Sequence, residues 1–444
     1  MSDNRLLNDC QRALDLARRH GADEVEVFGE ATRSIESGVE KDDLQISKSQ
    51  KETKLGIRAF IGNQVGFAST NDLERLEDAA IDAVTLAKAS PGDPHNVLPE
   101  PAKGKIPEGL HDPAAESFST ADAVKHAIRL LDCAKEVDKR VIVGEGSVIA
   151  QLRDRVLVNS AGAEHSERSS LFLYTILATA RDGELVSNMD YKFGTTRKVA
   201  DIDVESMVQR SCANALGSLG AERGESFKGQ VVLDPFAVYS LLLPLQFQLN
   251  ARNALRGMTR WKDALGDSVA TTSFSMVDDG LAPGGVATSS FDREGTPHRR
   301  LPLIENGVLR SFMHNAYTSH AMGVSNTGHA AGTAGSLPAI GPTNLTVVPG
   351  DVGKDQLISE IDRGLLVSRF SGNADPISGD FSGVAKAAYL IKNGKIDRPV
   401  AGSLIAGNVF DALKTMSGIS KETEQIFALT FPYLRLEDIS VTAE

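Results

Sequence analysis

The feature that most constrains the fold is an order of elements, helix then strands then helix, that occurs twice in the first half of the chain. Residues 1–90 and residues 115–221 both follow it. Residues 24–70 alternate polar and apolar side chains around a Gly-Asn turn signal at 62–63, a pattern typical of antiparallel strands with one buried face. Little sequence identity links the two copies. We therefore expect a weak duplication that forms an N-terminal domain of helices and strand meanders.

Helical periodicity flanks both meanders. The sequence predicts helices over residues 4–20, 72–89 and 120–136, each with an apolar stripe at helical spacing. Between the two copies, residues 91–113 hold six of the 17 prolines. Because proline disfavours both helices and central strands, this stretch is expected to be an extended linker or surface loop.

The pattern changes in the second half of the chain. Strand signals with tight turns dominate there, and the Asn-Gly dipeptides at 306–307 and 393–394 are typical of two-residue hairpin turns. The sequence therefore predicts an α+β protein with two domains. They are an N-terminal helix and strand-meander domain, residues 1–224, and a sheet-rich C-terminal domain, residues 225–444.

One helix near the start of the C-terminal domain has an unusual sequence. In VVLDPFAVYSLLLPLQFQLN, residues 231–250, Asp234 and Pro235 suit the cap and the first turn of a helix. The dense apolar run after them predicts a buried helix. Pro244 nevertheless falls in its interior, where proline removes a hydrogen bond and favours a kink.

Composition excludes several classes of function. The net charge is −12, whereas a nucleic-acid-binding protein needs a cationic surface, so we expect no direct contact with nucleic acid. No apolar run reaches the ~18 residues of a membrane span, and the N-terminus lacks the apolar segment of a signal peptide. Cys10, Cys133 and Cys212 are scattered, so we expect buried thiols in a reducing cytoplasm.

No catalytic constellation is complete in the sequence. None of the nine histidines precedes a glutamate, and the glycine-rich residues 328–336 lack the Lys-Ser/Thr ending of a P-loop. Four histidines, His298, His314, His320 and His329, lie within 32 positions of one another. Their spacing does not match ligand pairs on one helix, so we favour ordinary loop histidines over a metal cluster.

Two polar segments are candidate peptide-binding surfaces. FDREGTPHRR, residues 291–300, could bind a peptide carboxylate through its arginines, and SGNADPISGDFSG, residues 371–383, could present backbone N–H groups. A solvated hairpin loop and a structural multiple turn are equally compatible interpretations. The candidate substrate-binding residues are Asp292, Glu294, Arg299, Arg300, His329, Ser371, Asn373 and Asp380.

Several segments together resemble the TldD/PmbA proteins, also called the modulator of DNA gyrase family. They are GADEVEVF, KLGIRAFIGNQVGFAST, VVLDPFAV, SSFDREGTPHRRLPLIENGVL, NTGHAAG and NADPISGDFSGVAKAAYLIKNGKI. They follow the family's order through nearly the whole chain. The FDREGTPHR…IENGVL and SGN…P.SGDFS segments are more similar to the PmbA (TldE) branch than to the TldD branch.

The resemblance implies that the metal site of the peptidase branch is degenerate here. That branch carries His-Glu-x-x-x-His on the helix after the VVLDP-like strand, and a cysteine ahead of the P..GDF segment. Placed by that strand, the three motif residues fall at Leu243, Pro244 and Gln248, and the cysteine falls near Arg369. Leucine cannot ligate zinc, glutamine is a poor ligand, and proline cannot activate water. The resemblance therefore implies no catalytic residue and no metal in this chain.

The resemblance also implies a partner. In this family a TldD-like subunit holds zinc and cleaves unfolded peptides, among them a peptide-antibiotic leader and an unstable antitoxin, while a PmbA-like subunit completes the chamber. We therefore expect a non-catalytic subunit of a cytoplasmic heterodimer that is inactive alone and forms a homodimer when isolated. Two alternatives stay open. One is an autonomous hydrolase using His314 or His329 with Asp380, and the other is a regulatory protein that acts on DNA gyrase.

Overall fold

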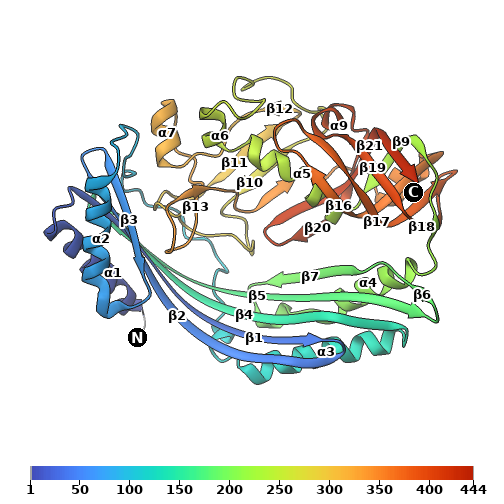
Figure 1. The fold of residues 1–444 in the computed structure, drawn as a ribbon, viewed down its shortest axis with the longest axis horizontal. Coiled ribbons are helices and arrows are strands. Elements are labelled where there is room, and N and C mark those ends of the chain that lie inside the picture. Colours follow the sequence, from blue (N-terminus) through green and yellow to red (C-terminus); the bar gives the residue numbers. More distant parts are fainter. Residues whose placement is uncertain (1–2, 444) are drawn as a thin grey trace.

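The computed structural model describes residues 3–443, and the first half of this chain forms one seven-stranded antiparallel sheet. The strand order is β3-β2-β1-β4-β5-β6, and β7 also pairs with β5. The strands are β1 Glu24–Glu40, β2 Asp43–Ile61, β3 Gln64–Thr70, β4 Val141–Asn159, β5 Glu164–Asp182, β6 Leu185–Val186 and β7 Asp190–Thr196. Four of them are much longer than an average strand, and they give the sheet its curved, elongated form (Figure 1).

The pairing of β1 with β4 joins the two copies of the repeated pattern. Each copy supplies a helix, a set of strands and a second helix, with three strands (β1–β3) in the first copy and four (β4–β7) in the second. The helices are α1 Asp3–Arg19 and α2 Leu76–Ala89 in the first copy, and α3 Thr120–Val137 and α4 Val204–Gly217 in the second. Single turns of 3-10 helix occur at η1 Leu73–Arg75, η2 Pro113–Glu116 and η3 Val199–Asp201. The expected duplication is therefore visible in the topology.

The alternation along the long strands divides the sheet into an apolar and a polar face. Val25 and Val27 of β1 pack with α1 and α2 in one core, and residues of β4 and β5 pack with α3 and α4 in another. The three cysteines are buried free thiols within these cores, as predicted. Because neighbouring side chains on a strand point to opposite faces, Glu26 and Glu30 of β1 lie on the polar face.

The C-terminal domain is built on a twelve-stranded sheet of order β12-β11-β10-β15-β21-β9-β16-β17-β18-β8, in which β19 pairs with β17 and β21, and β20 pairs with β21. The strands are β8 Glu222–Arg223, β9 Phe227–Leu233, β10 Met276–Asp279, β11 Arg300–Glu305, β12 Val308–Leu309, β15 Leu345–Val347, β16 Arg363–Ala374, β17 Asp380–Lys392, β18 Lys395–Ala401, β19 Ser403–Asn408, β20 Gly418–Ile426 and β21 Leu429–Ala443. A separate pair is β13 Ala330–Ala331 with β14 Ala339–Ile340. The mixed α+β class is thus confirmed.

Five helices and several tight turns complete this domain within the described residues 3–443. The helices are α5 Pro235–Gln248, α6 Ala251–Leu255, α7 Ala316–Met322, α8 Lys354–Ser359 and α9 Val409–Thr415. The predicted turns at 306–307 and 393–394 connect β11 to β12 and β17 to β18, and all four residues have the positive φ that these turns require. Since β8 pairs with β18, the C-terminal sheet begins at residue 222, slightly before the expected boundary.

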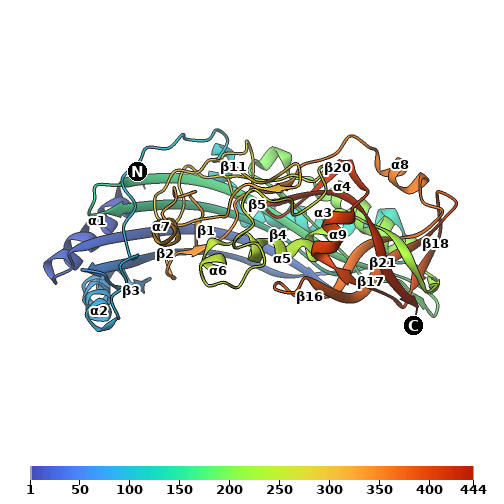
Figure 2. The same cartoon turned by 90° about the horizontal axis from the view of Figure 1, so that it is seen from above.

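The C-terminal domain lies over the polar face of the N-terminal sheet, while α3 lies against the opposite face (Figures 1 and 2). The approach is close at Gly56 of β2, where an added Cβ would lie 2.3 Å from the carbonyl oxygen of Ala334. Residues 91–112 contain no helix or strand, as the prolines predict. None of the helices in residues 3–443 has the length and apolar character needed to cross a bilayer.

Candidate functional site

The helix at the expected metal position, α5, is built by its cap and its apolar sequence. Asp234 accepts hydrogen bonds from the backbone N–H groups of Phe236 at 2.9 Å and Ala237 at 3.1 Å. Burial raises the pKa of the Asp234 carboxyl to about 7. The helix runs through Pro244 to Gln248 without interruption, so the proline is accommodated within one continuous element.

Gln248, at the position of the second histidine of the peptidase motif, is fully buried and serves the packing of three segments. Its Nε2 donates to the carbonyl oxygen of Pro376 at 2.6 Å, and its Oε1 accepts from the backbone N–H of Arg260 at 2.9 Å. The side chain therefore ties α5 to the loop after α6 and to the turn between β16 and β17. Both ends of the amide are occupied by these structural bonds.

The other residues at the expected metal position also lack metal-binding chemistry. Leu243 is apolar and 44% exposed, and Pro244 is buried. Arg369, at the cysteine position on β16, is a cation whose Nε has no hydrogen-bond partner in the described chain. Across residues 3–443 no three His, Cys, Asp or Glu side chains are arranged to hold a metal ion. The side chains at this position do not fit zinc, and we derive no reaction step through a metal here.

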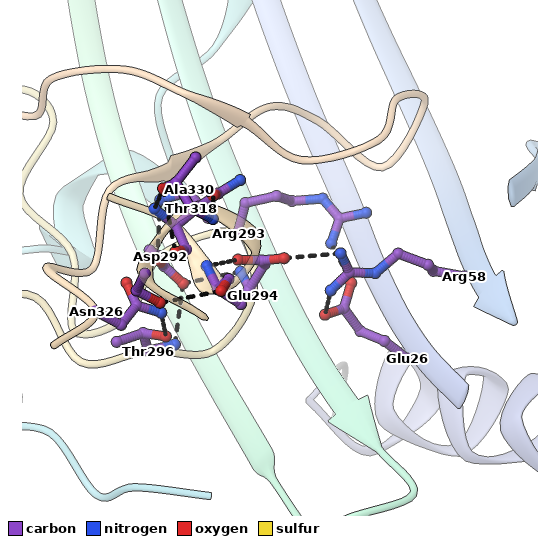
Figure 3. Close-up of polar contacts among 12 residues, drawn as sticks. Glu26, Arg58, Asp292, Arg293, Glu294, Thr296, Thr318, Asn326 and Ala330 are labelled. Atoms are coloured by element: carbon purple, nitrogen blue, oxygen red, sulfur yellow. Dashed lines mark hydrogen bonds and ion pairs between the residues drawn. The ribbon is translucent and has the colours of Figure 1, made fainter. Parts of the chain in front are cut away.

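A buried ionic network joins the two domains (Figure 3). Arg58 of β2 donates to Glu294 Oε1 at 2.7 Å and to Glu26 Oε2 at 2.6 Å, and Arg293 donates to Glu26 Oε1 at 2.9 Å. Glu294 Oε2 also accepts from the first N–H of α7, that of Ala316, at 2.8 Å. The charges of Glu26 and Glu294 raise the pKa of the Arg58 guanidinium despite its burial. The network holds the 292–296 turn against the sheet.

Asp292 organises this turn from within. Its carboxylate accepts from the backbone N–H groups of Glu294 at 2.8 Å, Thr296 at 2.9 Å and Ala330 at 2.9 Å (Figure 3). Burial, together with the neighbouring charge of Glu294, raises its pKa to about 8. Asp292 and Glu294 are therefore interior residues whose polar atoms are occupied by the fold.

His329 is buried as well and bridges two polar residues. Its Nε2 lies 3.0 Å from Asp278 Oδ2, and its Nδ1 lies 2.9 Å from Thr327 Oγ1. Burial lowers the pKa of the nearby His314 to about 4, so His314 is neutral at pH 7. Asp380, the acid expected beside these histidines, is exposed at the start of β17 and accepts a hydrogen bond from Asn408 at 2.8 Å. His329 is thus paired with Asp278.

The remaining candidates are exposed and fall in two places. Ser371, Asn373 and Asp380 lie together on the β16–β17 hairpin, where Asn373 is opposite Ser382. Arg299 and Arg300 lie at the start of β11, and Arg299 donates to the carbonyl oxygen of Asn326 at 3.0 Å. Substrate binding by these five residues stays a prediction. The structure therefore separates the eight candidates into a buried set and two exposed sets.

Sequence reasoning missed a polar groove on the N-terminal sheet. One cavity of about 320 Å³ is lined by Glu30, Thr32, Ser34, Gln50, Glu52, Lys54, Gln151, Arg153 and Thr333. An adjoining cavity of about 280 Å³ is lined by Gln151, Arg153, Arg155, Ser169, Leu171, Arg197, Val286, Ala287 and Thr288. The signal was present, because these sheet residues occupy every second position of long strands and are mostly charged or polar.

Arg197 fixes one wall of the groove. Its guanidinium donates to five backbone carbonyl oxygens at 2.7–3.3 Å, those of Leu110, Ser170, Gly285, Val286 and Thr288. Burial without a carboxylate partner lowers its pKa to about 10. Through these bonds the 285–288 loop of the C-terminal domain is held beside the sheet.

Comparison with known proteins assigns three parts of the chain to one family. Models of PmbA/TldA metallopeptidase domain 1, central domain and C-terminal domain match residues 25–87, 113–219 and 226–443. All three models describe domains of PmbA/TldA metallopeptidases. The chain belongs to the PmbA/TldD family, which confirms the resemblance drawn from the sequence.

Individual relatives agree with this assignment over almost the whole chain. Metalloprotease PmbA of Escherichia coli O157:H7 is 25% identical over 431 residues, 93% of this chain and 90% of that protein. A metalloprotease TldD homolog of Buchnera aphidicola subsp. Acyrthosiphon pisum is 25% identical over 383 residues, 83% of this chain and 79% of its own. The crystal structure of TldE from Thermococcus kodakarensis shares the fold, with a TM-score of 0.90 at 23% identity over 98% of this chain and 100% of that one.

Proposed function

We propose that this chain is the non-catalytic, PmbA/TldE-like subunit of a cytoplasmic two-subunit metallopeptidase that degrades or matures unfolded peptides. A TldD-like partner holds the zinc and carries out the cleavage. The observation that carries the proposal is the state of Gln248. This residue occupies a ligand position, but both ends of its side-chain amide are hydrogen-bonded, one to Pro376 and the other to Arg260, so it is not available to a metal.

The comparisons support a partner of this kind. Buchnera aphidicola subsp. Acyrthosiphon pisum has both a metalloprotease TldD homolog and a metalloprotease PmbA homolog, which are 25% and 21% identical to this chain. Two family members in one organism are what a division of labour between subunits requires. In our proposal the present chain takes the second role, and it forms a homodimer when the partner is missing.

The polar groove supports a role in holding peptide. Its walls offer hydroxyl, amide and charged groups along extended strands, which suit the alternating N–H and C=O groups of an extended, unfolded peptide. The exposed β16–β17 hairpin, with Ser371, Asn373 and Asp380, is a second surface that a peptide could follow. A peptide-antibiotic leader and an antitoxin are substrates of this type.

The two alternatives receive less support. An autonomous hydrolase built on His314 or His329 with Asp380 conflicts with the burial of both histidines and with the pairing of His329 to Asp278. For a regulatory protein that acts on DNA gyrase, a net charge of −12 disfavours any mode of action that needs direct contact with DNA.

The test is a mixing experiment with the full-length chain and a TldD-like protein from the same organism. Metal content and cleavage of an unfolded casein-derived peptide are measured for each protein alone and for the mixture. We expect no stoichiometric zinc and no cleavage with this chain alone, and cleavage by the mixture that exceeds that of the partner alone. Cleavage by this chain alone, or no change on mixing, would contradict the proposal.

A further inference from the structure

Arg153 occupies the point at which the two cavities of the groove meet. It lies on β4 in the polar face of the sheet, directly between Thr32 of β1 and Ser169 of β5. It lines both cavities. Any extended ligand that passes from one cavity to the other therefore passes this guanidinium.

Arg153 differs from the other arginines of the groove because its charge is not used by the fold. Arg155 donates to Glu167 and to Ser289 Oγ at 2.6 Å, and Arg197 is saturated by backbone carbonyls. For Arg153, no hydrogen bond or ion pair links its side chain to any residue within the described chain, 3–443. The acidic residue whose charge acts on the pKa of Arg153 is Glu30, and its carboxylate already accepts a hydrogen bond from the backbone N–H of Ala334 at 2.7 Å.

An unpaired guanidinium in a half-buried position is costly to the fold. Arginine offers five N–H donors and cannot lose its charge at physiological pH. Burial lowers the pKa of Arg153, the charge of Glu30 raises it, and the charge of Arg155 lowers it further, so desolvation is the main effect. A ligand that supplies an acceptor with negative charge recovers this cost on binding.

We propose that Arg153 is the carboxylate-binding residue of the groove, pairing through two parallel hydrogen bonds with a carboxylate of a bound peptide. The carboxylate is either the C-terminus of the peptide or an Asp or Glu side chain. The inference rests on the proposed function, since it takes an unfolded peptide as the ligand. It adds a preference for negative charge at one position along the groove.

The surroundings favour a carboxylate over a phosphate. Glu30 and Glu52 line the same cavity as Arg153, and they repel a doubly charged anion more strongly than a singly charged one. The planar guanidinium also matches a planar carboxylate, with two N–H groups facing two oxygens. Thr32 and Ser169 on either side offer hydroxyl groups to the peptide backbone.

The experiment measures binding of four unlabelled ten-residue peptides to the full-length chain by calorimetry at low salt. One pair differs only by a free or an amidated C-terminus, and the other, with amidated ends, differs only by one internal Asp or Asn. We expect one charged member to bind about tenfold more tightly than its neutral counterpart. The pair that shows the difference identifies the source of the carboxylate.

Three variants test the residue. In Arg153→Gln the tenfold preference for the charged over the neutral peptide should be lost, and Arg153→Lys should keep part of this preference because the charge remains. Lys51→Gln is the matched control. This substitution also removes one positive charge from the N-terminal sheet. Gln50 and Glu52, the neighbours of Lys51 on β2, line the groove, and because successive side chains on a strand alternate, Lys51 points to the opposite face.

Some outcomes would overturn the inference. They are a charge preference that persists in Arg153→Gln, equal binding of both members in each pair, or no binding of any peptide by the wild-type chain. Because the substituted residues lie on the N-terminal sheet, the folded state of each variant is checked by the urea midpoint of the far-ultraviolet circular dichroism signal. These failures differ from failure of the proposed function, which would show as unchanged cleavage on mixing with a TldD-like partner.

Discussion

Replacing Gln248 with alanine should destabilise the C-terminal domain by about 3–5 kcal/mol. The change leaves the carbonyl oxygen of Pro376 and the N–H of Arg260 without their partner, and each unsatisfied buried group costs about 1–2 kcal/mol. Gln248 is fully buried, so removing its side chain also leaves a small cavity that adds about 1 kcal/mol. The prediction follows from the structural role of the residue and not from any metal.

The chain contains a convenient reporter for this prediction. Trp261 is the only tryptophan, it is buried next to Arg260, and its ring packs edge-on against Phe410. Urea unfolding followed by tryptophan fluorescence therefore reports the C-terminal domain alone. Gln246→Ala is the matched control, because Gln246 is half-buried on the same helix and makes no side-chain hydrogen bond within residues 3–443.

The control should shift the free energy of unfolding by less than about 1 kcal/mol. Gln248→Glu gives a second, pH-dependent test. Its carboxylate faces the carbonyl oxygen of Pro376, so destabilisation should be largest at pH 8 and should decrease as the pH falls, because a protonated glutamate can donate there. Equal midpoints for Gln248→Ala and Gln246→Ala would refute the reasoning.

Three further predictions concern the interior. Arg58→Ala should cost about 3–5 kcal/mol, because it leaves two buried carboxylates short of a partner; a loss below 1 kcal/mol in urea unfolding would contradict this. Asp234→Asn keeps the helix cap but removes a carboxyl whose pKa rises to about 7 on folding. As the pH rises from 4 to 7, the free energy of unfolding of wild type should therefore fall relative to that of the variant, by up to about 4 kcal/mol. A difference between the two free energies that stays constant over this range would contradict the prediction. The three buried thiols should react with Ellman's reagent only in denaturant, and rapid labelling of the native protein would be inconsistent with their burial.

Local rules predicted much of the fold because they act within a few residues. Two-residue Asn-Gly turns need positive φ, and those at 306–307 and 393–394 formed hairpins where the sequence placed them. The cap at Asp234 and the helix over 120–136, observed as Thr120–Val137, depend on neighbours in sequence in the same way. The duplication was predictable because the order of elements repeats.

Long-range partners explain what the sequence did not show. Arg58 meets Glu26 across 32 positions and Glu294 across 236, and no local pattern specifies such a meeting. For the same reason His329 could not be assigned to Asp278, 51 positions away. Polar residues in the 291–300 loop indicated a surface, but burial against the sheet turned Asp292 and Glu294 into interior residues. The groove arises only when the C-terminal domain covers the polar face.

The most direct test of the division of labour is a cross-loading experiment. Metal is removed separately from this chain and from a TldD-like partner, each is either reloaded with zinc and desalted or left metal-free, and all four combinations are mixed and assayed on an unfolded peptide. We predict cleavage only when the partner has been reloaded, whatever the treatment of this chain. Cleavage that follows the zinc added to this chain, with the partner metal-free, would contradict the account.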